Sequence, residues 1–366
     1  MKGLLGLINL YEDESGMGVL ARQRPLAAMP YAGRYRLIDF ALSNLVNAGV
    51  RTVGVLVRDK YRSLIDHLRS GKEWDLARKR DGLYILPPAA TIGGPCNSDV
   101  DNFLFNLDYI SAATEDFVII CGSRTICNLP IDQVFQYHLS VEADVTIISR
   151  DWPDDGAGPC LSLDEEGRVM GMCDFTESLP YDIQPLGFYI MSKSLMAQLV
   201  RECAAEGSCD FFTDGVLKNI DKLKVYAFRH VGYVARIDSV ASYFQHQLEL
   251  LNPAIWQELF FRYGIIFTKV KDEAPAKYRE RACVTNSLVA NGCIIEGTVE
   301  NSILFRSVIV EKGAVVRNSI VIQNTRVGPN ARLTNVLCDK DSQVTAGRCL
   351  SGSAAQPFIV EKGSVI

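Results

Sequence analysis

The sequence predicts an α/β domain with a mixed, mostly parallel sheet, followed by a C-terminal left-handed parallel β-helix. Two observations carry this prediction. Strand-like and helix-like segments alternate over residues 1 to about 250, and from Val284 onward apolar residues repeat every six positions. A chain of 366 residues is also too long for one ordinary domain. We expect an α/β domain at 1–251, a helix and linker at 252–283, and the β-helix at 284–366.

The N-terminal part contains four short runs that are rich in Val, Ile and Leu. Such runs are typical of strands buried on both faces of a parallel sheet. They lie at 3–8, 52–57, 117–121 and 144–149. Helical patterns are found at 35–47, 61–70, 101–112 and 131–139. The short gaps between these segments favour a doubly wound sheet, which binds ligands at the carboxyl ends of its strands.

Residues 252–283 differ in composition from the segments on either side. They contain Pro253, Pro275 and the charged segment KVKDEAPAKYRERA. Because Pro and dense charge interrupt regular structure, we expect a helix followed by a linker.

The C-terminal part has a row of apolar residues, each six positions after the last: Ile303, Ile309, Val315, Val321, Val327 and Leu333. Two positions before each stands a small or turn-compatible residue: Asn301, Ser307, Gly313, Ser319, Thr325 and Ala331. An α-helix cannot keep such a row on one face, because its period is 3.6. A coil with three six-residue sides per turn can, and the row then points inward. IVEKG recurs at 309–313 and 359–363, so we expect the coil to resume after an interruption around 339–356.

The charge balance excludes several classes of function. The chain has 38 Lys and Arg and 43 Asp and Glu, a net charge of −5. A mildly acidic chain has no overall attraction to nucleic acid or to an anionic membrane. No apolar run reaches the roughly 18 residues of a membrane span, and the N-terminus lacks a secretion-type cleavage site. We therefore expect a cytoplasmic protein that binds neither nucleic acid nor membrane.

The cysteines predict neither a zinc site nor a redox motif. There are 11 of them, scattered along the chain, and none forms a CxxC pair. We expect reduced, mostly buried thiols and no metal ligand set in this chain.

Several segments of the chain resemble the bacterial glucose-1-phosphate adenylyltransferase (ADP-glucose pyrophosphorylase) family. They are PYAGRYRLIDFALSNLVNAGVRTVGVLV at 30–57, FNLDYI at 105–110, CDFFTDGVL at 209–217 and NSLVANGCIIEGTVENSILF at 286–305. The resemblance covers nearly the whole chain. It implies a Rossmann-like nucleotidyltransferase domain before the β-helix, and a reaction in which glucose 1-phosphate attacks the α-phosphate of ATP.

The glycine-rich loop of that family does not match this chain. The family loop resembles GGRGTRL and is followed by RAKPA, whereas here the two segments read YEDESGM and RPLAA. Tyr11, Glu12 and Glu14 replace glycines that bring backbone N–H groups to the triphosphate, and acids there repel it. The loop's second Arg aligns with Gly16, and the catalytic Lys aligns with Leu26.

The metal and sugar-phosphate positions also differ from the family pattern. The Asp of the family's GDH motif aligns with Ser123, and the Asp of its DVGT motif aligns with Arg236. The glucose-phosphate Lys aligns with Phe175. Asp238, two residues after Arg236 on an extended strand, is the alternative metal ligand that the sequence leaves open.

The resemblance is therefore strongest to the catalytically deficient second subunit of that enzyme. It implies a chain with no catalytic residues and no cofactor of its own, while Mg²⁺ is held only by the active partner subunit. It also implies assembly with that catalytic subunit, as a heterotetramer, to promote ADP-glucose synthesis for glycogen. Homo-oligomers of the isolated chain are a further expectation. Two alternatives stay open: an active nucleotidyltransferase with a rewired site, and a stand-alone sugar-phosphate sensor.

Three arginines are candidates for an effector or anion site. Arg24 and Arg36 match positions near which family members bind phosphorylated effectors, and Arg332 on the β-helix is a looser candidate. Several guanidinium groups together suit a phosphate. The alternative is a structural role, in which these arginines pair with acids such as Asp39 or lie in solvent.

Overall fold

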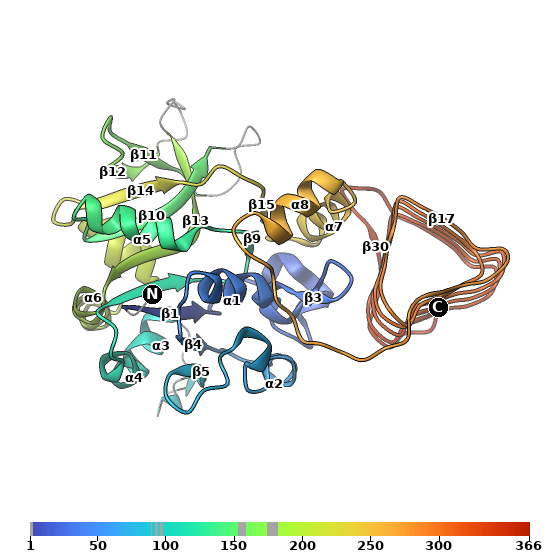
Figure 1. Ribbon diagram of the computed structural model, residues 1–366, viewed down its shortest axis with the longest axis horizontal. Helices are drawn as coiled ribbons and strands as arrows, with labels where there is room; N and C mark the ends of the chain where they lie inside the picture. The colour runs from blue at the N-terminus through green and yellow to red at the C-terminus, as the bar shows by residue number, and fades with distance from the viewer. Residues whose placement is uncertain (1–2, 89, 92–93, 96–97, 153–158, 174–181) are drawn as a thin grey trace.

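The computed structural model describes residues 3–88, 90–91, 94–95, 98–152, 159–173 and 182–366. It consists of an α/β body and a triangular prism of short strands (Figure 1). Helices α7 (Val240–Glu249) and α8 (Pro253–Phe261) lie between the two, and an extended segment runs from α8 to the prism (Figure 1).

A mixed nine-stranded sheet forms the centre of the α/β body. Its strands are β1 (Leu4–Asn9), β4 (Thr52–Leu56), β5 (Gly82–Leu86), β8 (Phe117–Cys121), β10 (Val145–Asp151), β11 (Leu161–Leu163), β12 (Val169–Met172), β13 (Ile183–Ser192) and β14 (Val225–Arg229). The order is β12-β11-β13-β8-β1-β4-β5, and β10 pairs with both β13 and β14. Shorter pairs are β2 (Pro30–Tyr31) with β3 (Tyr35–Arg36), β6 (Ala90–Thr91) with β7 (Gly94–Pro95), and β9 (Thr125–Cys127) with β15 (Val234–Arg236).

Helices surround this sheet: α1 (Leu37–Asn47), α2 (Arg62–Leu68), α3 (Asp99–Phe105), α4 (Leu107–Ala112), α5 (Ile131–Ser140) and α6 (Lys193–Glu206). Short 3-10 turns occupy Ser15–Ala21, Leu26–Ala28, Lys72–Trp74 and Leu217–Asn219, and a π-helical turn spans Phe211–Val216.

The predicted strands are all present. Those at 3–8, 52–57 and 117–121 are the parallel neighbours β1, β4 and β8, with Gly6 opposite Val53 on one side and Ile119 on the other. The run at 144–149 is β10, which is parallel to β14 but antiparallel to β13. The antiparallel pairing arises because the chain returns from β10 through the hairpin of β11 and β12.

Two predicted helices have different limits in the structure. Helix α1 begins at Leu37 and not at Tyr35, because Tyr35 and Arg36 pair with β2, and the Asp39 carboxylate accepts the Arg36 N–H at 2.9 Å. The helix expected at 101–112 is the pair α3 and α4, which meet at Asn106. The amide of that side chain donates to the carbonyl of Asn102, and such local bonds compete with the helix ladder.

The prism is a left-handed parallel β-helix built from three parallel five-stranded sheets. One sheet contains β16 (Lys277–Tyr278), β19 (Ile294–Ile295), β22 (Ile309–Val310), β25 (Arg326–Val327) and β28 (Gln343–Val344). The second contains β17 (Cys283–Thr285), β20 (Thr298–Glu300), β23 (Val315–Arg317), β26 (Arg332–Thr334) and β29 (Cys349–Ser351). The third contains β18 (Leu288–Val289), β21 (Ile303–Leu304), β24 (Ile320–Val321), β27 (Val336–Cys338) and β30 (Phe358–Val360).

The prediction of one unbroken inward row at every sixth residue is wrong. The interior of the prism holds Leu304, Val310, Val316, Val321, Val327 and Leu333, a row with a five-residue step after Val316. The hydrogen bonds from the Ser319 N–H to Ser302 and from the Val336 N–H to Ser319 each join residues 17 positions apart on successive turns. Three six-residue sides would need 18 positions, so one side of each such turn is a residue shorter than expected. Ile309 and Val315 consequently lie half-buried on the outside.

The corner residues show the same shift. Left-handed φ angles occur at Asn301, Ser307 and Gly313, as the six-residue row predicts, and then at Asn318 in place of Ser319. Asn324 and Asn330 continue the shifted row in place of Thr325 and Ala331. Gly and Asn tolerate this conformation best, so the asparagines mark the corners better than small residues in general do.

The expected interruption around 339–356 is also wrong. β28 pairs in register with β25, and β29 pairs with β26, so the coil continues through this segment. The irregular connection is confined to 352–357, and β30 then pairs with β27.

A buried apolar cluster joins the two bodies. It connects Tyr243 and Phe244 of α7 with Ile303, Ile320 and Leu337 on the outer face of the third prism sheet. Figure 1 shows the side of the prism that carries β30 turned toward α7 and α8. Burial of this apolar surface fixes the β-helix against the α/β body.

The expectation that the thiols are reduced is wrong at one pair. Cys160 and Cys173 form a disulfide across the ends of β11 and β12, where the Cys173 N–H also donates to the Cys160 carbonyl. The two residues lie opposite each other beyond the Leu161–Met172 pair, which brings their side chains together. Cys121, Cys127, Cys203, Cys293 and Cys338 are free and buried, whereas Cys209, Cys283 and Cys349 are free and exposed.

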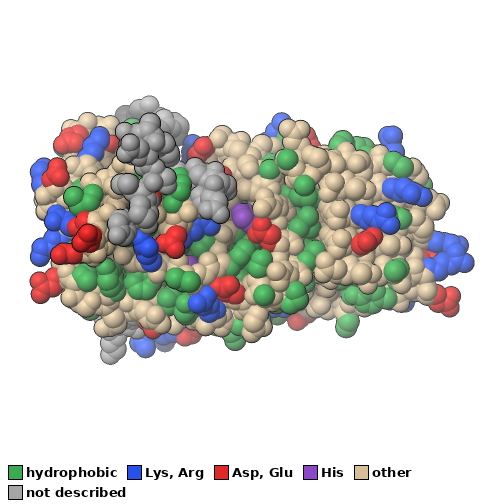
Figure 2. Space-filling model, turned by 90° about the horizontal axis from the view of Figure 1, so that it is seen from above, with side chains coloured by type: hydrophobic (Ala, Val, Ile, Leu, Met, Phe, Trp, Pro, Cys, Tyr) green, Lys and Arg blue, Asp and Glu red, His purple; other side chains and the backbone are tan. Residues whose placement is uncertain are grey.

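Across the part of the chain that the structure describes, none of the helices combines the length and the apolar character of a membrane span. On the face seen in Figure 2, Lys and Arg side chains are interspersed with Asp and Glu over the α/β body.

Candidate functional site

A cavity of about 360 Å³ opens at the carboxyl ends of β1 and β8. We call it the strand-end cavity. Three of the residues singled out from the sequence line it: Tyr11, Glu12 and Arg236. Ser123, at the end of β8, is buried beside it and contacts Glu12. The strand order therefore gathers these positions where a doubly wound sheet binds its ligands.

The Glu12 side chain occupies the turn after β8. Its carboxylate accepts hydrogen bonds from the Ser123 N–H at 3.1 Å, the Ser123 hydroxyl at 2.6 Å and the Arg124 N–H at 2.9 Å. A Cβ at Gly122 would lie 2.3 Å from a Glu12 carboxylate oxygen, so the two segments are in close contact. Donors that could face an anionic ligand are thus bonded within the protein.

Asp238 lies between two guanidinium groups. Arg124 donates to one carboxylate oxygen at 2.8 Å, and Arg236 donates to the other at 2.7 Å. Arg124 also donates to the carbonyl of Asp13 at 2.6 Å. Because both oxygens are neutralised by arginines, Asp238 does not fit the role of a metal ligand that the sequence left open.

Three other acids line the cavity: Asp13, Asp99 and Asp210. Asp13 accepts hydrogen bonds from the Ser15 N–H and hydroxyl, and Asp210 accepts one from the Thr213 N–H. Burial raises the pKa of Asp99 to about 7, although its oxygens accept hydrogen bonds from the Phe211 N–H and the Asn9 amide. Arg124 and Arg236 are the two cations among the described lining residues, and Asp238 holds both. Among the described residues, no three of these acids lie close enough together to hold a metal ion, and neither arginine is free to bind a triphosphate.

Glu14, Leu26 and Gly16, which the resemblance also aligns with the catalytic site, contact other parts of the protein. The Glu14 carboxylate accepts the Leu26 N–H at 2.5 Å, and burial raises the pKa of Glu14. Leu26 itself is buried in the apolar cluster that joins the two bodies. A Cβ at Gly16 would lie 2.0 Å from the Asp238 carbonyl, so this glycine allows the loop to approach β15 closely. Phe175 lies outside the described residues.

A group of side chains close enough to hold a metal occurs away from the strand-end cavity. Among the described residues it consists of Cys160, Cys173 and Asp182. The two sulfur atoms are joined in the disulfide, so they offer no thiolate ligand in this state.

The structure brings two of the three candidate anion-binding arginines together: Arg24 lies close enough to Arg36 for its charge to lower the pKa of Arg36, whereas Arg332 lies elsewhere. Arg24 is buried and forms an ion pair with Asp339 of the β-helix. Arg36 donates to the carbonyl of Ser63 at 2.6 Å, and burial lowers its pKa to about 10. Arg332 lies on β26, in the second prism sheet, whereas the third sheet contacts α7. Arg24 and Arg36 thus have the protein partners of the structural alternative.

Sequence reasoning missed two basic groups. Arg124 follows Ser123 directly and pairs with Asp238. The sequence shows only that the acids expected at the two metal positions are replaced, and it does not show this pairing. Lys340 lies near Arg24 and Arg36, and burial together with these two cations lowers its pKa to about 7. Its sequence position after Asp339 gives no signal of this, because the neighbours come from a distant part of the chain.

Comparisons with known proteins agree with both parts of the fold. A nucleotidyl transferase family model matches residues 19–229, and a GlmU-like C-terminal hexapeptide model matches residues 272–356. The glycogen biosynthesis protein GlgD of Bacillus subtilis is 38% identical over 363 residues, which cover 99% of this chain and 96% of that protein. GlgD of Geobacillus stearothermophilus is 39% identical over 364 residues, covering 99% and 97%. A glucose-1-phosphate adenylyltransferase of Pseudothermotoga lettingae is 31% identical over 322 residues, covering 86% and 77%.

Proposed function

The chain belongs to the nucleotidyl transferase family, and on this premise we propose that it is a regulatory subunit of glucose-1-phosphate adenylyltransferase with little or no turnover of its own. It assembles with the active subunit, as a heterotetramer, and promotes formation of ADP-glucose and diphosphate from ATP and glucose 1-phosphate. The relatives named for glycogen biosynthesis and for the adenylyltransferase support a role in glycogen synthesis.

The observation that carries this proposal is the internal pairing of the strand-end cavity. Glu12 takes the donors of the turn after β8, and Arg124 and Arg236 take the carboxylate of Asp238. Removal of one preorganised electrostatic partner commonly lowers a rate by about 10² to 10³. Here the metal carboxylates and the catalytic Lys that the family resemblance requires are absent together, and the arginines that remain are neutralised.

The rest of the chain retains what an assembly subunit needs. The nine-stranded sheet is complete, the β-helix keeps three continuous sheets, and apolar residues of both bodies share one buried cluster. Loss of selection on the whole protein would disrupt these features together with the catalytic positions. Their retention supports selection for shape and contacts.

ADP-glucose formation from ATP, glucose 1-phosphate and Mg²⁺ tests the proposal. The assay compares this chain alone, the active subunit of the same organism alone, and the two co-expressed. We expect the chain alone to be inactive and the co-expressed pair to exceed the active subunit in rate or in substrate affinity. Glu12→Gln and Ser123→Ala in this chain should leave the activity of the pair unchanged, because the turnover belongs to the partner.

Turnover by the isolated chain at a rate comparable to that of the active subunit would contradict the proposal and favour a rewired active site. A pair that behaves as the active subunit alone, with no complex detected by size-exclusion chromatography, would contradict the assembly role.

A further inference from the structure

Cys160, Cys173 and Asp182 form a compact group at the edge of the α/β body. Each offers one ligand atom, a sulfur or a carboxylate oxygen, and the three atoms lie within 4.8 Å of one another. Among the described residues it is the one group of His, Cys, Asp and Glu side chains with a metal-binding spacing. We call it the hairpin triad, because the two cysteines flank the β11–β12 hairpin. Figure 1 shows this hairpin at the end of the sheet opposite β4 and β5, away from the prism.

Strand pairing holds the three members of the hairpin triad in place. Leu161 of β11 pairs with one residue of β12 and one of β13, and Cys160, Cys173 and Asp182 are the next residues along these three strands. The Cys173 N–H donates to the Cys160 carbonyl at 3.0 Å, and the Asp182 carbonyl accepts the Trp152 N–H at 3.2 Å. The ligand atoms therefore project from fixed strand ends, which gives a metal site a defined geometry.

The hairpin triad is shielded from solvent. Cys160 is 3% exposed and Asp182 is 6% exposed, whereas Cys173 is half-buried. Clusters of exposed acids are common on protein surfaces, but here two of the three groups are buried and two are sulfurs. Two thiolates and a carboxylate at one buried place repel one another unless a cation lies between them. A divalent metal ion supplies that charge.

Two sulfurs and a carboxylate oxygen are a ligand set for zinc. Zn²⁺ binds thiolate sulfur at about 2.3 Å and carboxylate oxygen at about 2.0–2.2 Å, and tetrahedral geometry then places the ligand atoms about 3.5–3.8 Å apart. This spacing lies within the 4.8 Å over which the triad extends. Three protein ligands leave the fourth position for water. Mg²⁺ and Ca²⁺ prefer oxygen ligands, so the two sulfurs select against them.

We propose that the hairpin triad binds Zn²⁺ in the reduced chain, and that the disulfide is the oxidised, metal-free state of the same two cysteines. A dithiol reductant breaks the S–S bond: two electrons and two protons pass to Cys160 and Cys173, and the reductant becomes a disulfide. Zn²⁺ then displaces both thiol protons and forms two Zn–S bonds, with Asp182 as the third ligand. Because each sulfur takes part in either the S–S bond or a Zn–S bond, oxidation releases the metal.

The two states connect different parts of the fold. The disulfide joins the two ends of the β11–β12 hairpin to each other. Zinc bound to the triad also joins them to Asp182, which directly precedes β13. The site is separate from the strand-end cavity, because none of its three residues lines that cavity. It does not rest on the proposed subunit function.

Zinc titration of the full-length chain tests the proposal. The chain carries Cys209→Ser, Cys283→Ser and Cys349→Ser, which remove the exposed free thiols of the described residues. One sample is reduced with a phosphine, which is then removed without oxygen, and a second is oxidised with diamide, with peptide mapping to verify the Cys160–Cys173 bond. We expect the reduced sample to bind one Zn²⁺ at the triad, at least about 100-fold more tightly than the oxidised sample, because only thiolates ligate the metal.

Substitutions in the same background identify the ligands. Cys160→Ser and Cys173→Ser should each weaken Zn²⁺ binding by more than the roughly 10–100-fold that loss of an outer-shell partner costs. Each should also weaken the thiolate-to-metal charge-transfer band of the Co²⁺-loaded chain. Asp182→Asn should weaken Zn²⁺ binding but retain that band, because both sulfurs remain. Cys203→Ser is the matched control, since Cys203 is a free thiol of the same body and is likewise 3% exposed. It should leave the affinity and the band unchanged.

Three results would overturn the zinc site: no Zn²⁺ bound by the reduced chain at micromolar concentrations, equal binding by the oxidised chain, or binding that survives both cysteine substitutions. Cys173 is half-buried, so Cys173→Ser keeps the test decisive if Cys160→Ser does not fold. Unchanged affinity in Asp182→Asn would remove the carboxylate from the ligand set and overturn the three-ligand site. All of these readouts measure metal binding by this chain alone, so they are independent of the three-way activity assay.

Discussion

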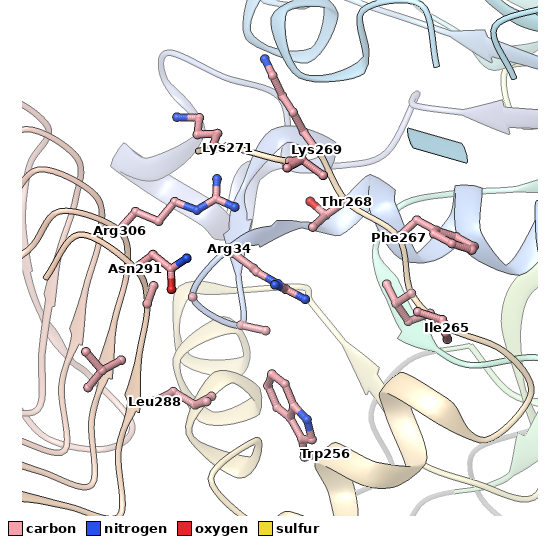
Figure 3. A pocket seen from close by; sticks show the side chains of 16 residues that line it. Arg34, Trp256, Ile265, Phe267, Thr268, Lys269, Lys271, Leu288, Asn291 and Arg306 are labelled. Carbon is pink, nitrogen blue, oxygen red and sulfur yellow. The ribbon is translucent and has the colours of Figure 1, made fainter. Parts of the chain in front are cut away.

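The strand-end cavity and a second cavity, of about 500 Å³ between the α/β body and the β-helix, both contain arginines, but they differ in how those charges are balanced. We call the second one the interdomain cavity. In the strand-end cavity Arg124 and Arg236 share Asp238, and Glu12 takes the backbone donors beside them. In the interdomain cavity Arg34 and Arg306 extend into the same space, and neither forms an ion pair with a carboxylate of the part of the chain that the structure describes (Figure 3). A buried charge that is paired within the protein is stabilised, whereas a buried charge that is left unpaired carries a desolvation cost.

Two buried arginines at the contact between the α/β body and the β-helix make this difference measurable. Arg24 is paired with Asp339, whereas Arg306 pairs with none of the carboxylates in the described ranges of the chain. We expect Arg24→Met to lower the free energy of unfolding by about 3–5 kcal/mol, because it leaves a buried carboxylate alone. The double change Arg24→Met with Asp339→Asn should recover most of this loss. Urea unfolding measures both, and a loss below about 1 kcal/mol for the single change would contradict the difference.

Removal of the Glu12 carboxylate from the strand-end cavity should have an intermediate effect on the free energy of unfolding. Glu12→Ala removes the acceptor of three hydrogen bonds, and water can replace part of it because Glu12 is half-buried. We expect a decrease of about 2 kcal/mol in the free energy of unfolding. Glu12→Gln, which retains one acceptor oxygen, should lose less. If Glu12→Ala is as stable as the unaltered chain, the hydrogen bonds from Ser123 and Arg124 to the Glu12 carboxylate do not stabilise the strand-end cavity.

Arg306→Met should act in the opposite direction from Arg24→Met in the absence of ligand. Replacing an unpaired buried guanidinium by an apolar side chain removes a desolvation cost, so we expect stability to rise by about 1 kcal/mol. Thermal unfolding of the ligand-free chain provides the measurement. A decrease as large as that for Arg24→Met would mean that Arg306 is already satisfied within the protein.

The smallest expected effect is a pH dependence due to Lys340. Because the pKa of Lys340 is lowered to about 7 in the folded chain, the unfolded chain binds more protons above that pH. Between pH 7 and about 8.5 the free energy of unfolding of this chain should therefore rise relative to that of Lys340→Met, because the buried thiols, which titrate at about 8.5 once unfolded, affect both chains alike. Asp99, with a raised pKa of about 7, contributes its opposite slope at lower pH. Urea unfolding of the two chains across this range measures the difference, and equal slopes would exclude a contribution from Lys340.

Much of the fold could be predicted from the sequence, because the features that determine it are local. Apolar runs predicted β1, β4 and β8, and the six-residue spacing predicted the β-helix. The one-residue shift after Val316 was not predicted, since a hydrophobic row tolerates either of two neighbouring aliphatic residues. The left-handed asparagines from Asn318 onward show the true register.

The candidate sites divide in the same way. The changes at Glu12, Ser123 and Arg236 were visible in the sequence through the family resemblance, but their mutual pairing depends on how the strand ends meet. Arg306 and Trp256 carried no sequence signal, since the side chains beside them include Arg34, which lies more than 200 positions away along the chain. Whether a buried charge has a partner can be seen only in the folded protein.

Titration of the Arg306→Met chain with ATP, with and without Mg²⁺, tests the central claim most directly. The substitution removes a buried guanidinium from the interdomain cavity, so ATP binding that persists is assigned to the strand-end cavity. We predict no saturable binding of ATP at millimolar concentrations and no effect of Mg²⁺, because Glu12 and Asp238 are engaged within the protein. Mg²⁺-dependent binding of ATP in the micromolar range that Asp238→Asn abolishes would show a working nucleotide site and contradict the account.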